Sequence, residues 1–280
     1  MKIGFNFLLA FAITNVAIFF SSCNTATTEE NKMSEPKIKT ADITYKVDSL
    51  NVKAFAAYDE NLPGKRPGIL VVPEWWGVTD YTKNRAKQLA GMGYYAMVVD
   101  MYGNGKTGDD PKAAAALAMP YYINPVLCKT RLDAALAKLR SMPETDAVNV
   151  AAIGYCFGGF VVLNAAKQGI DLKGIVSFHG GLGGVAPDKD LLKAAILVCH
   201  GEADSFVPQQ EVDAFKKGMD SIKKEYTFKS YPNATHAFTN PAATETGKKF
   251  SMPITYNAAA DTASWNDMKD FFNKIFVVGK

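Results

Sequence analysis

Short, continuous apolar runs separated by helical stretches constrain the fold of this 280-residue chain more than any other feature. Each run is short enough to be a strand buried on both faces, as in a parallel sheet. Helices between such strands form right-handed crossovers and cover both faces of the sheet. The predicted strands cover residues 67–73, 94–99, 150–155, 174–178, 195–199 and 226–231, and the predicted helices cover 79–90, 126–140 and 262–276.

Residues 43–58 show a different pattern, because apolar and polar side chains alternate on either side of Asp48-Ser49. This pattern predicts an antiparallel hairpin at the edge of the sheet. We therefore expect an α/β fold with a mostly parallel central sheet, forming one domain over residues 41–280. Ligands of such sheets gather at the carboxyl ends of the strands. The residues at those positions are Glu74, Trp75, Trp76, Asp100, Cys156, His179 and the segment from His200 to Asp204.

An apolar run at residues 3–20 ends shortly before Cys23 and resembles a bacterial lipoprotein signal, with Phe20 where an aliphatic residue is usual. The resemblance implies removal of residues 1–22, acylation of the Cys23 thiol and an extracytoplasmic location in the bacterial cell envelope. The alternative is an uncleaved anchor helix. Residues 23–40 are polar and charge-balanced, which predicts a flexible tether to the membrane.

Net charge and cysteine content exclude several kinds of partner and site. The formal net charge is +3 and the charged residues are interspersed, which argues against a nucleic-acid partner. Beyond Cys23, the three cysteines Cys128, Cys156 and Cys199 include no CxxC pair, so neither a disulfide framework nor a zinc site is indicated. At least one thiol should stay free, and we expect no cofactor.

The stretch GYCFGGF at 154–160 matches the G-x-nucleophile-x-G elbow in a strand-to-helix context. The glycines leave room for the helix to pack back on the strand while Cys156 adopts a strained backbone conformation. A helix N-terminus favours the thiolate and lowers the pKa of a cysteine there, and the amide of Phe157 can face an oxyanion. The alternative is that Cys156 is a small buried residue at a tight turn.

Two further residues complete a candidate catalytic set with Cys156. Asp204 follows one predicted strand and His236 follows another, so the order Cys, Asp, His is that of the α/β-hydrolase triad. His236 would take the thiol proton, and Asp204 would orient the imidazole. Taken separately, Asp204 could cap a helix and His236 could lie on a surface loop. His179 and His200 are interpreted as structural histidines, although His179 could line the pocket.

Five motifs occur in the same order and strand contexts as in the dienelactone hydrolase family, which the chain resembles from about residue 45 to its end. They are PEWWG at 73–77, GYCFGG at 154–159, SFHGGL at 177–182, HGEADSFVP at 200–208 and THAF at 235–238. The resemblance implies an α/β-hydrolase fold, no metal, and a triad of Cys156, His236 and Asp204.

The resemblance also assigns roles to residues around the triad. Glu74 would hold the thiol in the resting enzyme and accept its proton when substrate arrives, and the amides of Trp75 and Phe157 would form the oxyanion hole. A capping or salt-bridge role for Glu74 is the alternative. Trp76 and Tyr102 are further pocket candidates, although aromatic residues at a sheet edge are commonly packing residues.

The sequence departs from the founding family members, which bind a substrate carboxylate with arginines. One arginine position, four residues after the catalytic histidine, is Asn240 here, and residues 101–112 contain Lys106 but no arginine. A lysine does not reproduce a bidentate grip, so dienelactone itself is doubtful as the substrate. The GNGKTG stretch at 103–108 is interpreted as a mobile loop beside the pocket, since it does not open a helix directly after a strand.

The sequence thus predicts a hydrolase of carboxylic esters or lactones that works through an acyl-cysteine intermediate. Enol esters and lactones suit a thiol nucleophile, because thiolate is a better leaving group than alkoxide. The expected partners are a small ester or lactone and the membrane, with a monomer or a small homo-oligomer as the assembly. The alternatives are a non-catalytic hydrolase-like binding lipoprotein and a redox or stress protein that uses Cys156.

Overall fold

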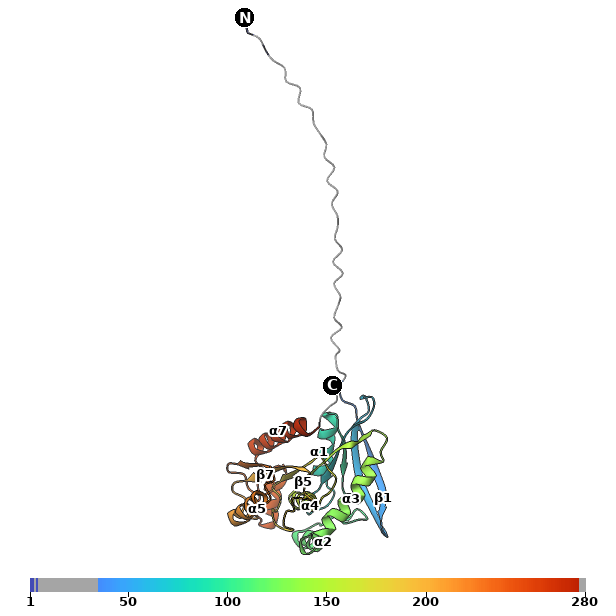
Figure 1. Cartoon of the computed structure of the whole chain (residues 1–280), viewed down its shortest axis with the longest axis vertical. Coiled ribbons are helices and arrows are strands. Elements are labelled where there is room, and N and C mark those ends of the chain that lie inside the picture. The colour runs from blue at the N-terminus through green and yellow to red at the C-terminus, as the bar shows by residue number, and fades with distance from the viewer. Residues whose placement is uncertain (3, 5–34, 277–280) are drawn as a thin grey trace. The chain divides into compact units, whose positions relative to one another are not determined.

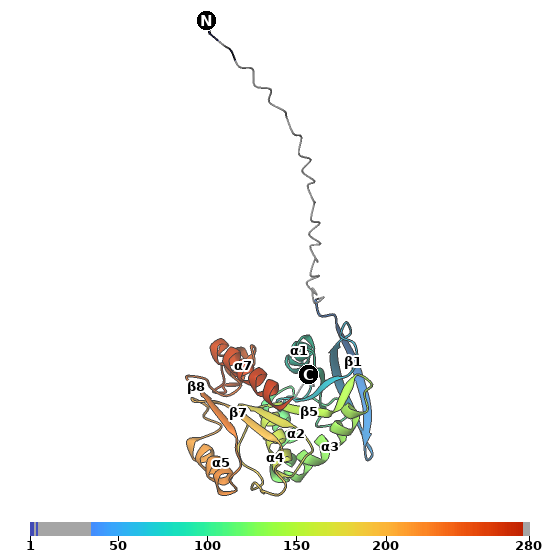
Figure 2. The ribbon, with the colours of Figure 1, turned by 45° about the horizontal axis from the view of Figure 1, so that its top comes forward.

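An eight-stranded sheet forms the centre of the computed structural model, which describes residues 1, 2, 4 and 35–276 (Figure 1). The strand order is β1-β2-β4-β3-β5-β6-β7-β8, and Figure 2 shows β1 and β8 at opposite ends. The β1–β2 and β2–β4 pairs are antiparallel and all other pairs are parallel, which confirms the predicted sheet and edge hairpin. The strands are β1 (Ile38–Val47), β2 (Leu50–Asp59), β3 (Arg66–Val72), β4 (Tyr95–Val98), β5 (Thr145–Tyr155), β6 (Gly174–Phe178), β7 (Ala195–Gly201) and β8 (Thr227–Tyr231).

Helices cover both faces of the sheet, as the continuous apolar runs predict. Along β3, Ile69 and Val71 belong to the core under α1 and α7, whereas Leu70 and Val72 belong to the core under α2, α3, α4 and α5. Figure 1 shows these two groups of helices on opposite sides of the sheet. The helices are α1 (Asp80–Gly91), α2 (Pro111–Ile123), α3 (Val126–Arg140), α4 (Phe157–Lys167), α5 (Gln209–Ser221), α6 (Ala243–Phe250) and α7 (Ala258–Ile275).

Three helices, α2, α5 and α6, are absent from the sequence-based assignment. The start of α2 carries a recognisable signal, since Asp110 caps the helix by accepting a hydrogen bond from the Ala113 amide and Pro111 occupies the first turn. Its run of alanines gives no apolar stripe, which is the feature that reveals α3 and α7 in the sequence. Both α2 and α6 contribute to the site described below.

The predictions for the N-terminal segment concern residues that the structure largely leaves undescribed. Cleavage of residues 1–22 and acylation of Cys23 lie outside the described residues and stay predictions. β1 begins at Ile38, inside the segment predicted as a tether. Within the described part of the chain, no helix combines the length and the apolar character needed to cross a membrane.

Candidate active site

Cys156 lies on a strained turn between β5 and α4. Its backbone angles are φ 53° and ψ −114°, a left-handed region that costs free energy for any residue other than glycine. The Cys156 amide donates to the carbonyl of Phe178 at 3.0 Å and to Nδ1 of His179 at 3.1 Å. These two acceptors, at the end of the neighbouring strand, hold the nucleophile candidate in its strained conformation.

Two glycines make this turn possible, which confirms the steric role predicted from the motif. A Cβ atom on Gly154 would lie 2.0 Å from the carbonyl oxygen of Gly158, and one on Gly158 would lie 2.2 Å from that of Val72. Both distances are far inside van der Waals contact, so α4 could not pack so closely on β3 and β5 with larger residues. Phe157 is the first residue of α4, and its amide therefore has no acceptor within the helix.

His236 and Asp204 come together on the loops after β8 and β7. Nδ1 of His236 donates to Oδ2 of Asp204 at 2.8 Å, and the other carboxylate oxygen accepts the Phe206 amide at 2.9 Å. Burial alone would lower the pKa of His236. The charge of Cys156, together with hydrogen bonds to Asp204 and Cys156, outweighs burial and raises this pKa to about 10. The imidazole of His236 therefore favours its protonated form, with the sulfur of Cys156 and the carboxylate of Asp204 as its two partners.

Glu74 follows β3 and is only 3% exposed. Oε2 of Glu74 accepts a hydrogen bond of 2.8 Å from Nδ2 of Asn240, whose Oδ1 accepts the Ala242 amide at 3.0 Å. Burial raises the pKa of Glu74 to about 7, although the Asn240 hydrogen bond and the charge of His236 act in the opposite direction. A carboxyl group with a pKa near neutrality that lines the same cavity as a thiol is suited to exchanging a proton there.

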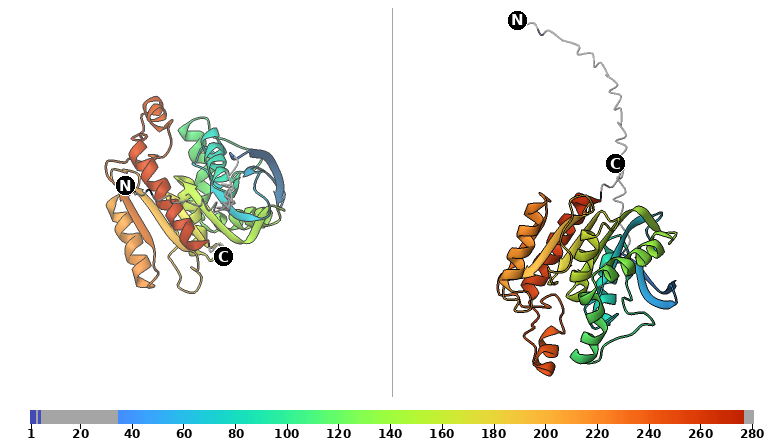
Figure 3. Two further views of the ribbon diagram at one scale, coloured as in Figure 1. Left: turned by 90° about the horizontal axis from the view of Figure 1, so that it is seen from above. Right: turned by 60° about the horizontal axis from the view of Figure 1, so that its bottom comes forward.

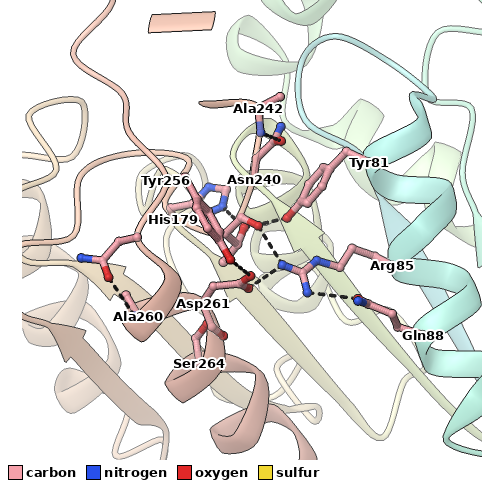
Figure 4. A network of polar contacts seen from close by, with 12 residues as sticks. Tyr81, Arg85, Gln88, His179, Asn240, Ala242, Tyr256, Ala260, Asp261 and Ser264 are labelled. Carbon is pink, nitrogen blue, oxygen red and sulfur yellow. Dashed lines mark hydrogen bonds and ion pairs between the residues drawn. The ribbon is translucent and has the colours of Figure 1, made fainter. Parts of the chain in front are cut away.

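A buried polar network lies beneath Cys156 and consists of Tyr81, Arg85, His179, Thr239 and Asp261 (Figure 4). Because Nδ1 of His179 accepts the Cys156 amide, Nε2 carries the proton and donates to Oγ1 of Thr239 at 2.7 Å. Burial, together with the charge of His236, holds the pKa of His179 well below its usual range, so this ring is neutral.

The network extends from Thr239 to helices on the far side of the loop that carries His236. Oγ1 of Thr239 shares a hydrogen bond of 2.7 Å with the Tyr81 hydroxyl, and the Thr239 carbonyl accepts from Arg85 at 2.7 Å. Arg85 also forms an ion pair with Asp261 of α7. The loop with the imidazole is thereby fixed to α1, α7 and the cysteine elbow together.

A cavity of about 510 Å³ opens above Cys156. Of the residues predicted for the site, it is lined by Glu74, Trp75, Trp76, Cys156 and His236. Its walls come largely from α2, from α6 and from the segment after α6, and Figure 3 (right) shows α2 in green and α6 in red at the same end of the domain. The wall residues are mainly apolar: Ala115, Met119, Tyr122, Phe160, Ala243, Met252 and Ile254.

The structure corrects the pocket assignment of two residues. Neither Tyr102 nor His179 is among the described residues that line the cavity. The Tyr102 hydroxyl donates to the carbonyl of Trp75 at 2.9 Å, and its ring stacks on Phe157 at 5.7 Å. Tyr102 therefore contacts both residues predicted for the oxyanion hole, Trp75 through a hydrogen bond and Phe157 through its ring.

Three cysteines lie among the described residues, and the glycine-rich loop is held by hydrogen bonds. Cys128, Cys156 and Cys199 are all free thiols, which confirms the prediction of at least one free thiol. In the GNGKTG loop, the Gly103 and Gly105 amides donate to Asp100, and the Gly108 amide donates to the Trp76 carbonyl at 3.1 Å. Among the described residues, no three His, Cys, Asp or Glu side chains are grouped as a metal site.

The fold and the site define an α/β-hydrolase: a candidate nucleophile on a strand-to-helix elbow, followed in the chain by an acid and then a histidine on later strand ends. The model of the dienelactone hydrolase family matches residues 52–276. The chain belongs to this family and is a hydrolase of its type.

Individual relatives agree with this assignment. The crystal structure of P91, described as a dienelactone hydrolase-like promiscuous phosphotriesterase from metagenomic libraries, superposes with a TM-score of 0.80 and 33% identity over 85% of this chain and 99% of that one. A Methylorubrum extorquens protein named "Putative carboxymethylenebutenolidase" is 27% identical over 75% of this chain and 73% of its own length. An uncharacterized Caenorhabditis elegans protein is 34% identical over 53% of this chain and 94% of its own.

Several residues of the site escaped the sequence analysis. Asn240 was noted only as a missing arginine, whereas the structure shows it as the partner of Glu74. Tyr81, Arg85 and Thr239 carry no local motif, because their importance comes from contacts across as many as 176 residues of sequence. A buried arginine on a helix such as α1 can be recognised only once its partners are known.

Proposed function

We propose that the protein hydrolyses carboxylic esters or lactones through an acyl-Cys156 intermediate. The observation that carries this proposal is the meeting of three groups at one cavity: the thiol of Cys156 on its elbow, the imidazole of His236, and the Asp204 carboxylate bonded to that imidazole. The raised pKa of His236 supports it, since a protonated imidazole stabilises a neighbouring thiolate.

The first half of the reaction follows from this geometry. The sulfur of Cys156 attacks the substrate carbonyl carbon, a carbon–sulfur bond forms, and the carbonyl oxygen becomes an oxyanion. The amides of Phe157 and Trp75 are the proposed donors to that oxygen. When the adduct collapses, the carbon–oxygen bond of the ester breaks and the leaving alkoxide or enolate takes the proton of His236.

Water completes the reaction. His236, now neutral and oriented by Asp204, accepts a proton from water as the water oxygen attacks the thioester carbonyl. The carbon–sulfur bond then breaks, which releases the carboxylic acid and returns the thiolate beside the protonated imidazole. Leaving groups that depart more easily than a thiolate favour the forward direction, so aryl esters, enol esters and lactones are the proposed substrates.

Glu74 is proposed to hold the thiol proton between turnovers. Its burial beside the cavity and a pKa of about 7 allow it to take up and release a proton near neutral pH. Asn240 holds the carboxyl group through one oxygen. We further propose that residues 1–22 are removed and that Cys23 is acylated, which would attach the enzyme to a membrane of the bacterial cell envelope.

Hydrolysis of p-nitrophenyl acetate or of an enol lactone by the purified protein tests the proposal. We expect turnover by the wild type and loss of at least 10³-fold in kcat in Cys156→Ala. Cys128→Ala is the matched control, since Cys128 is a buried thiol outside the cavity. Equal activity in Cys156→Ala would contradict the proposal, as would peroxide-driven sulfenic acid formation at Cys156 without any esterase activity.

A further inference from the structure

The cavity above Cys156 contains carboxylates but no cationic side chain of the kind that binds an anionic substrate. Of the described residues that line it, none is lysine or arginine, and Glu74 and Glu211 are the acidic ones. His236 is the remaining titratable base, and its charge is already shared with Asp204 and Cys156. A substrate with a second carboxylate would therefore find no partner for its charge.

Glu211 lies at the start of α5 and is fixed in place by the loop before β7. Its Oε1 accepts hydrogen bonds from the amides of Leu182 and Gly183. Two backbone amides thus hold this carboxylate in a fixed position at the cavity wall. Gly183 also lines the cavity, so the carboxylate belongs to the same surface as the loop that it holds.

One buried cation, Lys167, is near Glu211 and contacts the carbonyl groups of the same loop. Nζ of Lys167 donates to the carbonyls of Leu182 at 3.0 Å and Gly183 at 3.2 Å. Lys167 lines a second, smaller cavity of about 250 Å³ and is absent from the lining of the cavity above Cys156. Glu211 lines both cavities and Lys167 only the smaller one, so a ligand above Cys156 meets the carboxylate of Glu211 and not the ammonium of Lys167.

The remaining walls suit uncharged or cationic groups. Trp76, Tyr122, Phe160 and Phe206 place aromatic rings on the lining, and aromatic faces attract cations as well as apolar groups. The other wall residues are mostly aliphatic or small.

We propose that Glu211 makes this cavity selective for uncharged and cationic esters over esters that carry a second carboxylate. The inference rests on the proposed esterase function and names its substrate class. Like charges in a partly desolvated cavity repel enough to lower kcat/KM severalfold, and a cation gains by a similar factor, so the two effects together separate a cationic from an anionic ester by about tenfold or more.

Three p-nitrophenyl esters of matched chain length test the inference: the pentanoate, the monoglutarate with a terminal carboxylate, and the 4-(trimethylammonio)butyrate. In the wild type we expect kcat/KM for the cationic ester to exceed that for the glutarate about tenfold or more. A ratio near one, or a preference for the glutarate, would overturn the inference while leaving esterase function intact. Absence of turnover and of acylation with all three esters would overturn the proposed function, and this inference with it.

Two pairs of variants then test whether the charge of Glu211 causes this selectivity. Glu211→Gln keeps the amide-accepting oxygen and removes the charge, so the cation-to-glutarate ratio should fall about tenfold. Glu245→Gln removes an exposed carboxylate of α6 and should preserve the ratio. Met119→Lys places a cation on the exposed rim of the cavity and should also lower the ratio, whereas Ile123→Lys, on the same helix but outside the lining, should not.

The second pair keeps the test decisive if Glu211→Gln fails to fold, because Met119 and Ile123 are 48% and 77% exposed. A ratio that stays at the wild-type value in both Glu211→Gln and Met119→Lys would show that charge at the cavity wall does not select the substrate.

Discussion

The buried polar network beneath Cys156 and the walls of the cavity above it are built in opposite ways. In the network, Thr239 contacts His179, Tyr81 and Arg85 through hydrogen bonds that join three separate segments of the chain. The walls consist mainly of apolar side chains on α2 and α6, and some of these, such as Met119, are half exposed. The network fixes the positions of the catalytic segments, and the cavity walls provide apolar surface for a ligand.

The two regions therefore have different roles in this hydrolase. Hydrogen bonds are directional, so the network determines where the Cys156 elbow and the His236 loop lie relative to each other. Apolar contacts are less directional, so the walls can accept a variety of groups as long as they are uncharged or cationic. Changes in the network or in the triad should therefore affect kcat, whereas changes in the walls should affect KM.

The largest expected effect is that of Asp204→Asn. An asparagine cannot stabilise the imidazolium of His236 and disturbs its tautomer, so kcat should fall about 10³- to 10⁴-fold with little change in KM. Steady-state kinetics with p-nitrophenyl acetate measure this, with Asp213→Asn on the exposed side of α5 as the control. A decrease of less than tenfold would mean that the Asp204–His236 hydrogen bond is only structural.

Glu74→Gln should have a pH-dependent effect. Since the pKa of Glu74 is raised to about 7, the wild-type kcat/KM should rise as the pH increases through 7, and this limb should be missing from the variant. At pH 8 we expect a loss of about ten- to a hundredfold. An unchanged pH profile in the variant would assign that limb to another group.

The same substitution should stabilise the fold. A folded-state pKa above the ordinary value near 4.5 means that Glu74 contributes most stability when protonated, and that this contribution is lost as the pH rises through 7. Glu74→Gln should therefore gain little at pH 5 and about 3 kcal/mol in free energy of unfolding at pH 8. Urea denaturation at the two pH values measures this gain. Equal gains at both would show that the ionised carboxylate is not the cause.

Thr239→Val tests the network with a smaller expected effect. The valine leaves the buried Nε2–H of His179 without an acceptor, which should cost about 1–3 kcal/mol in stability. If the network positions the elbow, kcat and the rate at which iodoacetamide alkylates Cys156 should both fall about tenfold, with KM unchanged. Thr239→Ser keeps the hydroxyl and should restore both rates. Equal behaviour of the two variants would remove the hydroxyl from the explanation.

The smallest effect is expected at the wall. Met119→Ala removes apolar surface from the lining, so KM for p-nitrophenyl octanoate should rise severalfold while values for the acetate change little. Ile123→Ala, on the same helix and outside the lining, is the matched control. A large effect on kcat with the acetate would show that the walls also position the catalytic residues, which would break the distinction between the two regions.

The sequence predicted the strands and the elbow because both depend on local patterns. Continuous apolar runs marked the strands from β3 to β7, and the glycines around Cys156 marked the strand-to-helix turn. The carboxyl ends of the strands then indicated Glu74, Asp204 and His236. Glu74 and His236 line the cavity, and Asp204 accepts a hydrogen bond from His236 without lining it.

The sequence did not predict what depends on distant partners. Tyr102 was a pocket candidate, and so was His179 as the alternative to a structural role. Neither lines the cavity, since side-chain direction and partners cannot be read from their neighbours in the chain. The apolar walls were missed for a related reason. The alanine-rich α2 lacks a clear amphipathic pattern and α6 has only 8 residues, so nothing local placed them above the carboxyl ends of the strands.

Trapping of the covalent intermediate tests the central claim most directly. The protein would be mixed with p-nitrophenyl acetate, quenched in acid within one turnover, digested, and examined by mass spectrometry. We predict a single acetyl group on Cys156 that accumulates in a burst and disappears with the measured turnover rate. Turnover with no acyl group on Cys156, or with the label on another residue, would contradict it.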